Sequence, residues 1–232
     1  LTVHEGEIGG VFGLMGAGQD LLARALFGAV PHVEGEVFLE GRSIRLTSPQ
    51  AAIAHRMALV TEDRKQEGLI LIDDLVGNTT LAALDRFTRA GFLERRRQRE
   101  VTASFVNRLR IRTPSLHQEV GYLSGGNQQK VVLAKWLATD PAVFILVEPP
   151  RGIDVGAKAE IYHIMDGLAR QGRGVLFVSS ELPEILGLSD RILVMADGRL
   201  QGELDPEQTS QEEIMTLATG LAAAGRGSAP GR

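Results

Sequence analysis

The feature that most constrains this chain is a pair of glycines that leads directly into a helix. Residues 123–130 read LSGGNQQK, and a helical pattern continues to Thr139. The first backbone N–H groups of a helix have no partner inside the helix, and they bind anions that lie beyond its N-terminus. The segment therefore predicts a phosphate-binding surface, with Ser124, Gly125, Gly126 and Gln128 as its residues. The alternative is that the two glycines only join a loop to a helix.

A second glycine-rich turn follows the first apolar run of the chain. Residues 8–12 predict a short buried strand, residues 13–20 read GLMGAGQD, and a helix follows through Leu26. This is the spacing of a P-loop, in which the backbone wraps phosphates at a helix N-terminus. Two positions differ from an intact loop: Gln19 replaces the lysine that reaches the phosphates, and Asp20 replaces the hydroxyl that holds Mg²⁺. We expect the loop to keep its shape, through Gly13, Gly16, Ala17 and Gly18, and to bind triphosphate poorly.

Asp20 also changes the electrostatics of this loop. A carboxylate about 4 Å from a phosphate charge costs about 4 kcal/mol at an effective dielectric constant of about 20, unless a metal ion bridges them. Carboxylate oxygens are good ligands for Mg²⁺, so Asp20 is a candidate for weak Mg²⁺ binding. The five histidines share no ligand-like spacing and the chain has no cysteine, so the sequence predicts no dedicated metal site.

Three further positions show the same loss of catalytic side chains. The apolar run 143–147 predicts a buried parallel strand that ends at Glu148, the position of a water-activating base, but Val147 stands where an aspartate would secure Mg²⁺. Glu148 could instead cap the loop that follows its strand. The run 174–178 leads to Ser180, where a histidine would contact the γ-phosphate, and Glu62 stands where a glutamine is expected. Glu148 and Ser180 are thus remnants of a catalytic set.

Four segments together resemble the second, C-terminal cassette of the tandem ATP-binding cassette (ABC) ATPases that drive ribose, galactose and xylose importers. They are residues 13–18, the EDRK sequence at 62–65, RGIDVGAK at 151–158 and SSELPE at 179–184. The resemblance covers residues 1 to about 220. In that family the first cassette keeps the catalytic set and the second is commonly degenerate. Val147, and Pro150 where a threonine is usual, depart even from the family pattern.

The resemblance implies an α/β fold: a P-loop NTPase-like ABC ATPase core with a mainly parallel sheet, a small antiparallel hairpin region and an inserted helical subdomain. We expect the P-loop side of the core at 1–75, the helical subdomain at 76–120, the rest of the core at 121–219 and a flexible tail at 220–232. Residues 78–112 predict an almost wholly helical segment. Hairpin turns are expected at Glu40-Gly41 and Asp197-Gly198, and a helix start at Ser48-Pro49.

The same resemblance implies a function. The chain would be a degenerate nucleotide-binding domain that supplies its signature motif, residues 124–128, to ATP and Mg²⁺ held by an intact N-terminal cassette of the same polypeptide. Its other partners would be transmembrane permease subunits, and it would lie peripherally on the cytoplasmic face of the inner membrane. We expect the domain by itself to be inactive as an ATP hydrolase. A formal charge of −4 argues against nucleic acid as a partner. The alternatives are an ABC-type interaction module without transport and a scaffold that binds no nucleotide.

Overall fold

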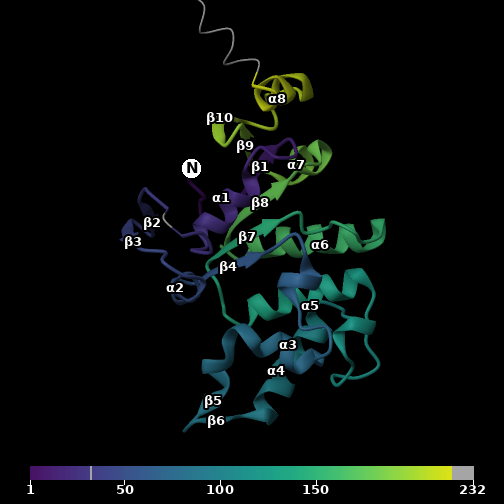
Figure 1. The fold of residues 1–232 in the computed structure, drawn as a ribbon. Coiled ribbons are helices and arrows are strands. Elements are labelled where there is room, and N and C mark those ends of the chain that lie inside the picture. The colour runs from purple at the N-terminus through teal and green to yellow at the C-terminus, as the bar shows by residue number, and fades with distance from the viewer. Residues whose placement is uncertain (32, 221–232) are drawn as a thin grey trace, which may run out of the picture.

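A six-stranded sheet forms the centre of the protein in the computed structural model, which describes residues 1–31 and 33–220 (Figure 1). The strand order is β10-β9-β1-β8-β7-β4, and only β10 runs antiparallel to its neighbour. This confirms the predicted mainly parallel sheet. Its strands are β1 (Ile8–Gly13), β4 (Met57–Val60), β7 (Val143–Val147), β8 (Gly174–Ser179), β9 (Arg191–Ala196) and β10 (Arg199–Leu204).

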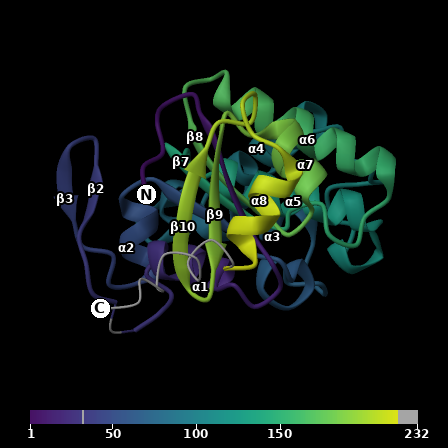
Figure 2. The same ribbon diagram turned by 90° about the horizontal axis from the view of Figure 1, so that it is seen from above.

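The strands β1, β4, β7 and β8 are almost wholly apolar because both faces of the sheet are covered. Every residue of β1, β4 and β8 is buried, and β7 is buried from Phe144 to Val147. Figure 2 shows α6 and α7 on one side of the sheet, and α1, α2 and the hairpin β2–β3 on the other. The bounds of these elements are α1 (Gln19–Leu26), β2 (Val37–Leu39), β3 (Arg42–Ile44), α2 (Pro49–Ala54), α6 (Val155–Ala169) and α7 (Leu182–Leu188), with α8 (Gln211–Ala218) packed on β9 and β10.

Several local predictions are confirmed by the backbone. The β2–β3 and β9–β10 hairpins turn at the expected dipeptides, with Glu40 and Asp197 at positive φ. Ser48 caps α2, since its hydroxyl accepts a hydrogen bond from the amide of Ala51 at 3.2 Å. The second strand of the first hairpin, β3, begins at Arg42 and ends at Ile44.

Most of the remaining helices lie at one end of the molecule, away from the sheet (Figure 1). They are α3 (Leu75–Thr80), α4 (Arg95–Arg108), α5 (Gly125–Leu137), and the short turns η1 (Arg64–Gly68), η2 (Leu81–Phe87) and η3 (Val120–Tyr122). The prediction that residues 78–112 are almost wholly helical is wrong in one place, where β5 (Thr88–Arg89) and β6 (Phe92–Leu93) form a hairpin. The helical turn η2 ends at Phe87, because Thr88 is extended, and Ala90 and Gly91 adopt the positive φ of a two-residue hairpin turn.

Gly220 is the last residue that the structure describes. The predicted flexible tail from Gly220 to Arg232 lies, from residue 221 onward, outside the described residues. Within residues 1–31 and 33–220, none of the helices combines the length and the apolar character that crossing a bilayer requires.

Candidate functional site

The predicted nucleotide-site residues lie at one edge of the sheet. The P-loop follows β1, Glu148 follows β7, Ser180 follows β8 and Glu62 comes two residues after β4. These four strands are parallel and form the contiguous row β1-β8-β7-β4, so their carboxyl ends meet at the same edge. The structure therefore brings together residues that are up to 167 positions apart, from Gly13 to Ser180.

The P-loop has the expected backbone, with the side chain of Gln19 folded into it. Gly18 stands in the left-handed conformation (φ 95°) just before α1, and the amide of Gly198 holds the loop by donating to the carbonyl of Ala17 at 3.0 Å. Gln19 is buried, and its Nε2 donates to the carbonyl of Gly13 at 3.1 Å. A lysine at position 19 would extend an ammonium group toward a phosphate bound in the loop. The side-chain amide of Gln19 instead turns back and bonds to the loop itself.

Asp20 is paired with an arginine of its own helix. Its Oδ2 accepts a hydrogen bond from Nε of Arg24 at 2.8 Å, and the same guanidinium contacts both carboxylate oxygens of Glu67 at 3.0 Å. The other oxygen of Asp20, Oδ1, is buried without a partner in the described part of the chain. The repulsion expected between Asp20 and a phosphate is therefore reduced, and Oδ1 is the one oxygen that the position leaves for a metal ion.

These residues differ from the side chains that hold Mg²⁺-triphosphate in an intact P-loop. The amide of Gln19 occupies the loop, no hydroxyl stands at position 20, and the buried side chain of Val147 presents only methyl groups at the end of β7. An Mg²⁺ ion at this edge would lack the hydroxyl and aspartate ligands that the P-loop chemistry uses. Within residues 1–31 and 33–220, no three carboxylate or imidazole side chains gather in a way that could hold a metal ion.

The carboxylate of Glu148 bonds to the loop after the neighbouring strand β8 and, within the described residues, not to the loop that follows its own strand. Its Oε1 accepts a hydrogen bond from the backbone amide of Ser180 at 2.6 Å, which joins the ends of β7 and β8. The residue stands at φ 45°, a conformation that non-glycine residues rarely adopt. The carboxylate thus holds the loop after β8. The side chain of Ser180 itself is exposed.

A polar cluster lies next to Ser180, and sequence reasoning assigned no role to its members. Glu184 is buried and accepts hydrogen bonds from Lys158 at 2.8 Å, from Tyr162 at 2.6 Å and from Ser179 at 2.9 Å. Burial alone would raise the pKa of Glu184, but these three donors outweigh it and hold the pKa below its ordinary value. Burial and the neighbouring carboxylate raise the pKa of Tyr162. Lys158 also contacts Glu181 at 3.0 Å, so the cluster ties α6 to the start of α7.

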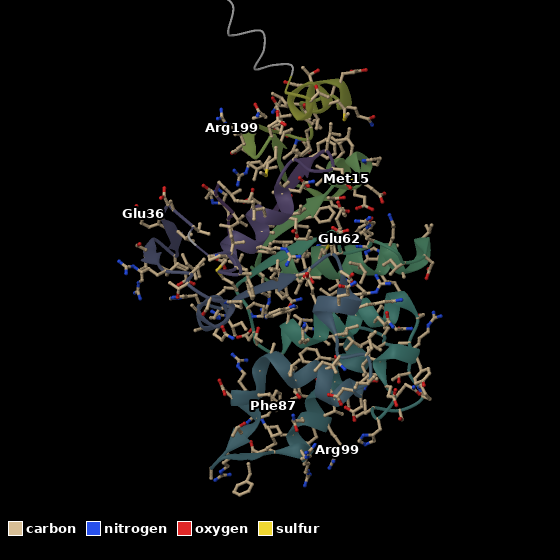
Figure 3. The ribbon with its side chains drawn as sticks, in the orientation of Figure 1. Met15, Glu36, Glu62, Phe87, Arg99 and Arg199 are labelled. Atoms are coloured by element: carbon tan, nitrogen blue, oxygen red, sulfur yellow. The ribbon has the colours of Figure 1, made fainter. Side chains whose placement is uncertain are left out.

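Glu62 pairs with an arginine from a distant loop. Its carboxylate forms an ion pair with Arg151, and Arg64 donates to the carbonyls of Arg151 at 2.8 Å and Gly152 at 3.2 Å. The loops at 62–65 and 151–152 enclose a hollow of about 320 Å³. Figure 3 shows Glu62 between the P-loop residue Met15 and the helical end of the molecule. The segments 62–65 and 151–158, recognised as motifs in the sequence, contain these partners, but nothing in the sequence pairs them.

The glycine pair begins α5 as predicted. Ser124 is the residue before the helix, it is exposed, and its hydroxyl accepts a hydrogen bond from Nδ2 of Asn127 at 2.9 Å. A Cβ atom at Gly125 would lie 2.7 Å from Nη2 of Arg64, and one at Gly126 would lie 2.5 Å from Cβ of Ala157. A side chain at Gly126 would therefore meet the methyl group of Ala157 on α6, whereas at Gly125 only the flexible end of Arg64 would have to shift, and neither glycine has a positive φ.

The side chain of Gln128 points into the protein. It is buried, and its Nε2 donates to the carbonyl of Val120 at 3.2 Å. Only the exposed start of α5 is thus open to another molecule. No hydrogen bond or ion pair among the described residues joins residues 124–128 to residues 13–20, so one chain does not combine the two predicted phosphate-binding surfaces.

Comparison with protein families matches residues 1–151 to the family described as "ABC transporter". The chain is 51% identical over 219 residues to the ribose import ATP-binding protein RbsA of Rhodopirellula baltica, covering 94% of this chain and 43% of that protein. It is 47% identical over 219 residues to RbsA of Geobacillus kaustophilus, with 94% and 44% covered, and 46% identical over 218 residues to the galactose/methyl galactoside import ATP-binding protein MglA 1 of Photobacterium profundum, with 93% and 44% covered. The chain spans less than half the length of these relatives.

Solved structures support the same fold. A dimeric ATP-binding cassette, MJ0796, in a post-hydrolysis state with ADP and Pi has a TM-score of 0.75 at 21% identity, covering 89% of this chain and 88% of that chain. A nucleotide-free ATP-binding cassette from an ABC transporter has a TM-score of 0.76 at 19% identity, with 94% and 86% covered. At these identities the likeness concerns the fold, and it confirms the expected α/β cassette architecture.

Proposed function

This chain belongs to the ABC transporter family, as an ATPase domain homologous to ribose and galactose import ATP-binding proteins, and we propose that it is the degenerate second cassette of such a protein. In this proposal its own P-loop binds nucleotide poorly, and its signature segment, residues 124–128, completes an ATP site on an intact N-terminal cassette of the same polypeptide. The work of ATP hydrolysis would be coupled to monosaccharide import through transmembrane permease subunits, from the cytoplasmic face of the inner membrane.

The observation that carries the proposal is the contrast between the two glycine turns. At the first, Gln19 folds onto the carbonyl of Gly13 and leaves no cation for phosphate. At the second, Ser124 is exposed immediately ahead of α5, and the first N–H groups of a helix have no partner inside it. Residues 124–128 would therefore bind a phosphate that another domain presents, rather than one held by the P-loop of this domain.

The division of the chain follows from the same interpretation. We propose that residues 76–120 form the helical subdomain between two parts of the core, 1–75 and 121–219. Glu148, Ser180 and Glu62 would be structural remnants of the nucleotide site. The carboxylate of Glu148 and the backbone amide of Ser180 hold each other, and Glu62 is held by Arg151.

Calorimetry and a phosphate-release assay on this chain test the proposal. We expect Mg²⁺-ATP to bind no tighter than the high micromolar range and turnover to be negligible, because the charge, metal and γ-phosphate contacts are replaced. The relatives are named as ATP-binding proteins, so the second candidate is an ordinary ATP-hydrolysing domain. Low-micromolar binding, or turnover near the ~1 s⁻¹ low end of ordinary enzymes, would establish that candidate and contradict ours.

A further inference from the structure

We propose that the tip formed by the β5–β6 hairpin and the first turn of α4, residues 88–99, docks onto a membrane surface that contains acidic phospholipids. Residues 88–99 are called the arginine tip below. The tip lies at the end of the molecule opposite α8 (Figure 1), and the labelled residues Phe87 and Arg99 mark its position in Figure 3. The proposal does not depend on the function proposed above.

The arginine tip exposes large apolar side chains at the turn of a hairpin. Phe92 is 80% exposed and Leu93 is 41% exposed, and every residue from Thr88 to Leu93 is exposed. Adjacent exposed aromatic and aliphatic side chains at the far point of a protein are unfavourable in water, since each keeps its apolar area in contact with solvent. Here nothing else in the described chain covers them.

The arginine tip also concentrates positive charge on an acidic protein. Residues 88–99 contain five arginines and one glutamate, a formal charge of +4, whereas the whole chain carries −4, so the rest of the chain carries −8. Arg96 and Arg97 are paired with Glu100 at 2.8 Å and Glu94 at 3.3 Å. The other three, Arg89, Arg95 and Arg99, are exposed and have no ion pair or side-chain hydrogen bond within the described residues.

The tip is presented on a fixed base. The amide of Glu94 donates to the carbonyl of Phe87 at 2.8 Å, which closes the hairpin onto α4. Phe87 is buried, and the guanidinium of Arg97 lies 5.7 Å from the centre of its ring. The apolar side chains and the unpaired guanidinium groups are therefore carried together on one small scaffold.

This combination matches the interface of an acidic bilayer. Phe and Leu side chains of interfacial segments bury their apolar surface at the boundary between headgroups and acyl chains, and guanidinium groups bind phosphate oxygens through paired hydrogen bonds. Basic clusters are attracted to the negative surface potential of a membrane over a distance set by the Debye length. Nucleic acid fits less well, because Leu93 has no role against a stacked base and the −8 charge of the remaining chain repels a long polyanion.

Vesicle binding tests the proposal on the purified chain. We expect co-sedimentation with vesicles in which about a third of the phosphatidylcholine is replaced by phosphatidylglycerol, little with phosphatidylcholine alone, and a loss of binding at high salt. The triple variant Phe92→Ser, Arg95→Glu, Arg99→Glu should partition about tenfold less or weaker still. A matched control, Arg199→Glu with Leu200→Ser, removes another exposed arginine and its exposed neighbour on β10 and should bind like the wild type.

Two further variants keep the test decisive if the triple variant folds poorly. Arg95→Lys with Arg99→Lys retains the charge and should retain binding. Phe92→Trp should show a blue shift of tryptophan emission on phosphatidylglycerol vesicles but not on phosphatidylcholine, over the constant signal of buried Trp136. Equal binding to both vesicle types, an absence of binding to either, or binding to single-stranded DNA through these residues without vesicle binding would each overturn the proposal.

Discussion

Gln19 and Asp20 show how single side chains change a phosphate loop without changing its path. The loop keeps the glycine conformations of a P-loop, yet Gln19 donates to Gly13 and Asp20 is held by Arg24. Both contacts are short-range and satisfy groups that would otherwise face a ligand. At this scale the chemistry of the site is decided by which atoms the side chains carry, because the backbone is the same in either case.

The double variant Gln19→Lys with Asp20→Thr tests this interpretation. The lysine restores a cation and the threonine a metal-binding hydroxyl, while Glu67 still pairs with Arg24 at 3.0 Å. We expect Mg²⁺-ATP affinity to rise by about tenfold, the equivalent of ~1.4 kcal/mol, with no gain in turnover, since Val147 and Ser180 are unchanged. Calorimetry and phosphate release measure the two quantities. Turnover from these two changes alone would show that our account of the site is wrong.

Lys135 is a buried ammonium group without a carboxylate beside it. Its Nζ donates to the carbonyl of Gly68 at 2.6 Å and lies 5.1 Å from the centre of the Trp136 ring. Burial lowers the pKa of Lys135 from 10.5 to about 8. Because the unfolded chain then binds more protons than the folded chain above this value, the free energy of unfolding rises with pH.

Lys135→Met should remove this pH dependence. Between about pH 8 and about pH 9.5, we expect the stability of the wild type to rise by about 2 kcal/mol relative to the variant. Urea unfolding of both proteins across this range measures the difference. Parallel stability curves would mean that Lys135 is charged in the folded protein over the whole range.

At the scale of elements, the packing of α7 on β1 limits the size of the residues that β1 can carry. A Cβ atom at Gly10 would lie 2.0 Å from Oγ of Ser189, which follows α7, and 3.3 Å from Cδ1 of Ile185 within it. At the neighbouring Gly9 the nearest atoms are 3.9 Å away. The strand that leads into the P-loop can therefore carry a side chain at one glycine and not at the next.

The pair Gly10→Ala and Gly9→Ala measures this packing. We expect Gly10→Ala to destabilise the protein by about 1–3 kcal/mol because the added methyl group overpacks the contact with Ser189. Gly9→Ala, where the methyl group finds ordinary van der Waals distance, should change the free energy of unfolding by less than about 1 kcal/mol. Denaturant midpoints give both values. Equal losses in the two variants would argue against a specific contact between β1 and α7.

At the scale of the whole molecule, the two glycine turns are parts of different surfaces. The P-loop follows β1 within the sheet, whereas Ser124 begins α5 beside Arg64 and the loop at Gly152. The proposed function uses this arrangement, because a signature segment that makes no hydrogen bond or ion pair with its own P-loop, within the described residues, is available to another one.

Substitution of Ser124 in the full-length protein tests this role, and it rests on the proposed second cassette. Ser124→Arg places a bulky group at an exposed position and should abolish ATP hydrolysis by the assembled transporter, by blocking the helix N-terminus. Gly126→Asp is less suitable, since its Cβ would contact Ala157 and disturb the packing of α5 on α6.

Gln19→Ala is the comparison for this experiment. If the P-loop of this domain has already lost its catalytic side chain, ATPase rate and sugar uptake should stay within a few fold of wild type. ATPase activity of both variants is measured in the assembled transporter. An unaffected rate in Ser124→Arg, or an inactive Gln19→Ala, would contradict the proposed division between the two cassettes.

The sequence by itself determined the features that depend on neighbours along the chain. Apolar runs predicted β1, β7 and β8, glycine and turn dipeptides predicted the P-loop backbone and two hairpins, and Ser48 predicted its helix start. Only the tertiary structure decided which distant groups meet: Glu62 with Arg151, Glu148 with the amide of Ser180, and Glu184 with Lys158 and Tyr162. The first two pairs form where separate strands of a parallel sheet end together, and the third joins α6 to α7. All three depend on packing of the whole core rather than on local periodicity.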